Sequence, residues 1–220
     1  MADAPDRQAL LTALTTEHFT LQGARSQTVS ESASRASLYL FSVSSTLIAL
    51  GFVTQVSEAG EVFQLFALAV LPTLFFLGLS TFVRLVESSV EDIVYGRAIN
   101  RIRHYYLEHA GPQARYFMLT GHDDVFGVIR NMGLPPGGRW QLLFTAASAV
   151  SVINGVVGGG AVAILLGVTL DLPLAVAALA GAAFLLVSVA LCMRYDRRRH
   201  EGAGGFTEVL FPSPPPEPGG

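Results

Sequence analysis

Four long apolar runs, separated by polar segments, dominate the pattern of this chain. They cover residues 36–56, 63–83, 140–168 and 172–193, and none of them contains Asp, Glu, Lys, Arg or His. A helix rises about 1.5 Å per residue, so about 20 apolar residues cross the hydrocarbon core of a bilayer. Backbone polar groups in lipid must be hydrogen-bonded within the chain, and each run is therefore predicted to be a transmembrane α-helix.

The positive charges lie on one side of these runs. All 14 basic residues are Arg, and they precede the first run, separate the second from the third, or follow the fourth. The short connections after the first and third runs carry only Glu58, Glu61 and Asp171. Basic residues flanking a span remain cytoplasmic. We therefore expect a multi-pass protein of the cytoplasmic membrane with both termini in the cytosol.

The two connections expected on the external side of the membrane, after the first and third runs, are too short to form a domain. The predicted fold is an all-α integral membrane protein whose four transmembrane helices form two antiparallel hairpins. Exclusive use of Arg, with abundant Ala, Gly and Val, is typical of a GC-rich bacterial genome, so the cell inner membrane is the expected location.

The second run continues beyond the membrane. No Gly or Pro occurs between Val83 and Gly96, and an apolar row of fourfold spacing continues to Tyr106. Such spacing places the row on one helix face. It predicts a long cytosolic extension of helix 2, whose apolar face packs on the amino-terminal leader, on the rest of the central segment, or on a second subunit.

Composition divides the chain into five parts. These are a cytosolic amphipathic leader (1–35), a transmembrane hairpin (36–83), a cytosolic helical segment (84–139), a second hairpin (140–193) and a cytosolic tail (194–220). The Gly/Pro-rich tail is predicted to be disordered. Within it, an apolar patch offers the alternative of a docking peptide, formed by Phe206, Val209, Leu210 and Phe211.

Small residues recur at fourfold spacing in the last two runs. Gly155 and Gly159 in the third run, and Ala177 and Gly181 in the fourth, let two helix backbones approach closely in lipid. We expect tight packing of helices 3 and 4. The Gly158–Gly160 run offers the alternative of a hinge or break.

The absence of ionisable residues from the spans argues against pumps, proton-coupled transporters and voltage sensors. A pore would need polar residues at membrane depth. Its candidate lining residues are Ser42, Ser45, Thr46 and Asn154, but hydrogen bonding of the hydroxyls within their own helix, with contact between helices, is the favoured interpretation.

One cytosolic cluster carries residue types that support chemistry. His122, Asp123 and Asp124 could bind a metal or act in acid–base chemistry, but capping of the following short helix by Thr120 or Asp123 is the favoured interpretation. Motifs of nucleotide binding and hydrolysis are missing from the sequence. We therefore expect no catalytic residues, metal ligands or cofactor.

Arg97, Arg101 and Arg103 form a basic patch on the helix 2 extension. The patch suits anionic lipid headgroups or a phosphorylated ligand, or is a solvated face.

These features favour a membrane scaffold or interaction protein without catalytic activity, acting through its cytosolic helices and tail. The alternative is a homo-oligomeric pore gated from the cytosolic side. Expected partners are the lipid bilayer, further copies of the chain and a cytosolic protein, but no nucleic acid.

Overall fold

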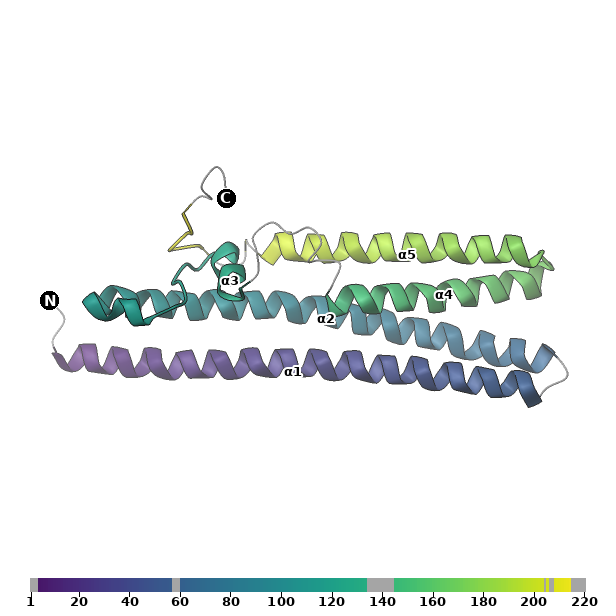
Figure 1. Cartoon of the computed structure of the whole chain (residues 1–220), viewed down its shortest axis with the longest axis horizontal. Coiled ribbons are helices and arrows are strands. Elements are labelled where there is room, and N and C mark those ends of the chain that lie inside the picture. The colour runs from purple at the N-terminus through teal and green to yellow at the C-terminus, as the bar shows by residue number, and fades with distance from the viewer. Residues whose placement is uncertain (1–3, 57–59, 134–144, 204, 206–207, 215–220) are drawn as a thin grey trace. The chain divides into compact units, whose positions relative to one another are not determined.

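The computed structural model describes residues 4–56, 60–133, 145–203, 205 and 208–214. All regular structure in these ranges is helical (Figure 1): α1 (Ala4–Val56), α2 (Gly60–Ala110), the 3₁₀ helix η1 (Gly111–Tyr116), α3 (Val125–Asn131), α4 (Ala146–Leu170) and α5 (Leu174–Ala203). Helices α1, α2, α4 and α5 are long and apolar enough to cross a membrane. The prediction of an all-α chain with four candidate membrane spans is confirmed.

Three helices have bounds that differ from the expected ones. The leader is the first half of α1, which runs from Ala4 without a break because no proline interrupts it after its first turn. Helix α5 continues to Ala203, so the first ten residues of the tail, 194–203, are helical rather than disordered. Helix α4 begins at Ala146, and the expected start at residue 140 lies outside the described residues.

The chain divides into two compact units. Among the described residues, the apolar unit contains 32–56, 60–87 and 145–198, and the polar unit contains 4–31, 88–133, 199–203, 205 and 208–214. Each unit therefore combines parts of the sequence that lie far apart.

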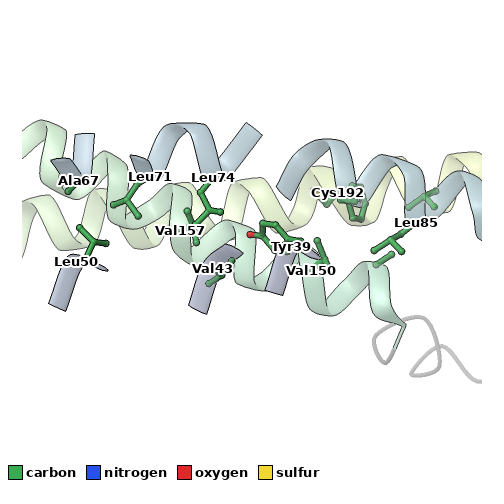
Figure 2. Packing of buried hydrophobic residues seen from close by; sticks show 13 residues of the cluster. Tyr39, Val43, Leu50, Ala67, Leu71, Leu74, Leu85, Val150, Val157 and Cys192 are labelled. Atoms are coloured by element: carbon green, nitrogen blue, oxygen red, sulfur yellow. The ribbon is translucent and has the colours of Figure 1, made fainter. Parts of the chain in front are cut away.

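The core of the apolar unit draws on all four long helices (Figure 2). Its buried side chains include Tyr39, Val43 and Leu50 from α1, Leu71 and Leu74 from α2, Val150 and Val157 from α4, and Cys192 from α5. Large apolar side chains also cover the outside of this unit, as a lipid-facing surface requires: Ile48, Phe52, Leu65, Phe76, Leu179 and Leu186 are all more than half exposed.

A buried polar pair joins α1 to α4 inside this apolar core. The Tyr39 hydroxyl donates a hydrogen bond to Oδ1 of Asn154 over 3.1 Å, and both residues are almost fully buried. Gly78 of α2 makes room for the pair, because a Cβ atom there would collide with both side chains. A buried amide needs such a partner, since leaving it unpaired costs about 1–3 kcal/mol.

Helices α4 and α5 are in backbone contact. A Cβ atom on Gly159 would lie 2.5 Å from the carbonyl oxygen of Gly181, and a Cβ atom on Gly181 would lie 2.5 Å from that of Gly159. Gly155 faces Leu185 and Val189, and Ala177 is buried. Helix α4 is continuous through Gly158–Gly160. The helix ends at Leu170, and the C-cap residue Asp171 adopts the left-handed conformation with a φ of 50°.

We predict that Gly159→Ala lowers the stability of the protein, because the added methyl group would force two helix backbones apart. Overpacking of this kind costs roughly 1–3 kcal/mol. Gly160→Ala is the matched control, since a Cβ atom there has no neighbour within 4 Å. Thermal unfolding in one detergent should give a lower Tm for Gly159→Ala only. Equal Tm values for both variants would contradict the backbone contact.

Candidate peptide-docking site

One face of α2 in the polar unit holds the turn that precedes α3. Arg97, Asn100, Arg101 and His104 share this face because they are three or four residues apart. Arg97 Nε donates to the Asp123 carbonyl over 2.7 Å, and Asn100 Nδ2 donates to the His122 carbonyl over 2.8 Å. The turn is therefore fixed through its backbone.

Two glycines allow this close approach. A Cβ atom on Gly121 would lie 2.7 Å from the Cα atom of His104, and one on Gly96 would lie 2.7 Å from Val128. Asn131 of α3 adds a further link by donating to Asn100 Oδ1 over 2.9 Å. The turn and α3 therefore lie directly against α2, beside which α3 is seen in Figure 1.

Asp123 is the buried centre of this arrangement. Its side chain is fully buried, and its Oδ2 atom accepts hydrogen bonds from Nε and Nη2 of Arg101 over 2.8 and 2.6 Å. A carboxylate inside a protein requires this kind of pairing, because burial removes its hydration.

The carboxyl-terminal segment 208–213 supplies the remaining hydrogen bonds to Asp123. The backbone N–H of Phe211 donates to Asp123 Oδ1 over 2.8 Å, and that of Leu210 donates to Oδ2 over 3.2 Å. In return, the Asp123 N–H donates to the Phe211 carbonyl over 3.1 Å. The segment is thus held mainly through its backbone.

Asp124 binds the same segment two residues further on. The Ser213 hydroxyl donates to Asp124 Oδ1 over 2.7 Å, and the Ser213 N–H donates to Oδ2 over 3.1 Å. Asp124 Oδ1 also caps α3 by accepting from the Gly127 N–H over 2.8 Å. The helix cap is therefore Asp124, and the expectation of Thr120 or Asp123 was wrong, because the side chain of Asp123 turns toward Arg101.

Two side chains of α2 complete the site. The Phe211 ring stacks on the His104 ring, with centroids 3.6 Å apart and planes inclined by 14°. Arg101 Nη2 also donates to the Glu208 carbonyl. One face of α2 therefore contacts both the backbone and the aromatic ring of the segment.

The electrostatics favour ionised carboxylates. Burial alone would raise the pKa of Asp123, but hydrogen bonds from the Phe211 and Leu210 N–H groups and from Arg101 hold it below its ordinary value of 3.8. Burial would also raise the pKa of Asp124, but hydrogen bonds from Ser213 and from the Gly127 N–H outweigh burial and hold the pKa below its ordinary value. Groups with a lowered pKa in the folded state stabilise it above their unfolded pKa. This contribution is present at neutral pH and is lost only as the pH falls below 3.8.

The leader part of α1 packs on another side of α2. Arg25 donates from Nε and Nη2 to the two carboxylate oxygens of Asp92 over 2.6 and 3.0 Å. The His18 ring contacts the Tyr106 ring, and burial, followed by the charge of Arg103, lowers the pKa of His18. The leader therefore packs on α2 and contacts Tyr106, the last residue of its apolar row.

The basic residues and the candidate pore residues named from the sequence occur in two different parts of the structure. Arg97 and Arg101 hold the 121–124 turn, while Arg103 donates to Asn100 Oδ1. Their contact with anionic lipid stays a prediction. Among the candidate pore residues, Asn154 is paired with Tyr39, the Ser42 hydroxyl donates to the Leu38 carbonyl, Ser45 is exposed and Thr46 is half-buried.

The candidate docking peptide contacts the protein differently from what its apolar residues suggested. The side chains of Val209 and Leu210 are 37% and 49% exposed, Phe211 carries the ring contact, and Phe206 lies outside the described residues. Sequence reasoning missed Ser213. The only available signal was its place in a Pro-Ser-Pro sequence beside the apolar patch.

Comparison with models of known protein families, with curated proteins and with solved structures finds no match for this chain.

The polar atoms of His122, Asp123 and Asp124 have different surroundings. The oxygens of Asp123 and Asp124 face protein donors, and His122 Nδ1 is buried without a hydrogen-bond partner among the described residues. The site holds an extended chain through two carboxylates (Asp123 and Asp124), one guanidinium (Arg101) and one aromatic ring (His104).

We predict that Ser213→Ala weakens the docking of segment 208–213, because it removes a hydrogen bond to an anionic acceptor worth about 1–2 kcal/mol. Chymotrypsin cuts after Leu210 only when the segment is undocked, so the cleavage rate follows the open population. We therefore expect cleavage of the Ser213→Ala chain after Leu210 to be roughly fivefold faster than cleavage of the wild-type chain. Val209→Ala serves as the control, and equal rates for the two variants would contradict the role of Ser213.

Proposed function

We propose that this protein is a multi-pass membrane scaffold that binds a partner protein through its polar unit, without catalytic activity. The observation that supports the proposal is an extended segment, 208–213, seated on Asp123 and Asp124. Proteins commonly hold extended peptides through hydrogen bonds to the main chain together with a contact for selected side chains.

The membrane arrangement is part of the proposal. We infer that α1 and α2 form one antiparallel hairpin across the bilayer and that α4 and α5 form the second. The confinement of Arg to the leader, the central segment and the tail supports a cytosolic polar unit. The cell inner membrane is the proposed location.

An exposed apolar surface of the polar unit supports binding of a further protein. Tyr116, Phe117 and Met118 are consecutive and are 73%, 42% and 92% exposed. Tyr116 is the last residue of η1, and Phe117 and Met118 follow it before the 121–124 turn; all three lie outside the four apolar runs. Contiguous exposed apolar side chains away from lipid are typical of protein interaction sites.

A homo-oligomeric pore is the second candidate function. Ser45 is exposed on α1 within a candidate span, where a neighbouring copy or a water-filled lumen would cover it. Polar side chains in lipid favour association of helices. This candidate requires several copies of the chain.

We predict that a photo-crosslinking amino acid at position 118 forms a discrete product with a different protein in the cells that express this chain. The matched control is position 191, because Leu191 is 61% exposed on α5 within a candidate span. Purified protein in liposomes should produce no ion flux above that of protein-free liposomes. Ion flux without a crosslink at position 118 would contradict the scaffold and favour the pore.

A further inference from the structure

The docked segment presents a short recognition sequence. Its contacts are three backbone N–H groups, two carbonyls, the Phe211 ring and the Ser213 hydroxyl. Pro212 lies between the last two of these N–H groups, where a residue without a donor leaves nothing unpaired. Proline also restricts the backbone, which lowers the entropy lost on docking. The sequence Phe-Pro-Ser therefore carries most of the recognition.

The side chains just before this sequence make no hydrogen bonds. Val209 and Leu210 are aliphatic and remain 37% and 49% exposed. No contact requires the segment to belong to the same chain. A segment of another protein with Phe-Pro-Ser, preceded by any residue except proline, would present the same three N–H donors, the same hydroxyl and the same ring to the site.

The occupant is held close by its connection to α5. Helix α5 ends at Ala203, and Glu208 already contacts Arg101. A short connection gives the segment an effective concentration in the millimolar range. A segment of modest intrinsic affinity would thus occupy the site most of the time and exclude competitors.

We propose that the site formed by Arg101, His104, Asp123 and Asp124 binds a Phe-Pro-Ser segment of a partner protein, and that residues 208–213 are an intramolecular competitor for it. The inference rests on the proposed scaffold function and specifies its ligand and its regulation. A partner displaces the segment by adding contacts, and the exposed residues Tyr116–Met118, just before the turn, offer them. The tail of a second copy would offer the same segment without the short connection to α5, and is therefore the weaker competitor.

The test uses the full-length protein in detergent and a fluorescein-labelled peptide of sequence EVLFPSP, which copies residues 208–214. In the Phe211→Ala chain, the competing segment loses its ring while the site keeps its residues. We expect saturable binding of the peptide to this variant by fluorescence anisotropy. For an intrinsic Kd near 100 µM, the wild-type chain should need roughly tenfold more peptide, because its own segment competes at millimolar effective concentration.

Two controls assign the binding to the carboxylates. A peptide with alanine in place of serine leaves the protein unaltered and should bind at least about fivefold more weakly, because it lacks the hydrogen bond to Asp124. Asp124→Asn in the Phe211→Ala chain preserves a good helix cap but removes the charge, and it should weaken binding similarly. Unfolding temperatures of the two chains should agree, so that lost binding is not lost folding.

Absence of saturable binding of the peptide to the Phe211→Ala chain would overturn the proposal. It would also be overturned if the peptide bound the wild-type and Phe211→Ala chains with equal affinity, or if the alanine peptide bound as tightly as the serine peptide. A wild-type dimer that dissociates on Phe211→Ala would identify a second copy as the occupant and would also overturn it. The crosslink at position 118 distinguishes failure of the scaffold proposal from failure of the ligand assignment. If the crosslink forms while the peptide fails to bind, the scaffold function stands and the Phe-Pro-Ser assignment is wrong.

Discussion

The polar unit depends on one buried carboxylate. Asp123 is fully buried, and burial of an ion is unfavourable by several kcal/mol unless its oxygens are paired. Arg101 of α2 supplies one charge, and the N–H groups of Leu210 and Phe211 supply the remaining donors. The turn, α2 and the carboxyl-terminal segment are thereby interdependent, because removal of any one leaves the others with an uncompensated charge or open donors.

The described residues of the apolar unit include no buried charge of this kind. Its helices contain no ionisable residue at the expected membrane depth, so electrostatic pairing cannot fix their packing. Close backbone contact at Gly159 and Gly181 and the Tyr39–Asn154 hydrogen bond provide specificity instead. In lipid, where apolar burial gives little net drive, packing of small residues and interhelical hydrogen bonds are the available forces.

Much of the fold could be predicted from the sequence, because apolar length and helical spacing are local properties. The four candidate spans, the unbroken α2 and the need of Asn154 for a partner follow from such patterns. The role of Asp123 could not be predicted, since its partners Arg101 and Phe211 are 22 and 88 residues away. Composition also misjudged the tail: proline and glycine indicate disorder, yet Pro212 suits a docked segment because its neighbours carry the hydrogen bonds.

The most direct test of this account is amide hydrogen exchange at Leu210, Phe211 and Ser213 in the wild-type protein. These three N–H groups donate to Asp123 and Asp124, so exchange requires undocking. The account predicts exchange at least about tenfold slower than in an unstructured chain of the same sequence, since a tenfold excess of the docked form corresponds to only about 1.4 kcal/mol. Exchange at the unstructured rate would show that the segment does not dock, and would contradict the role assigned to the two carboxylates.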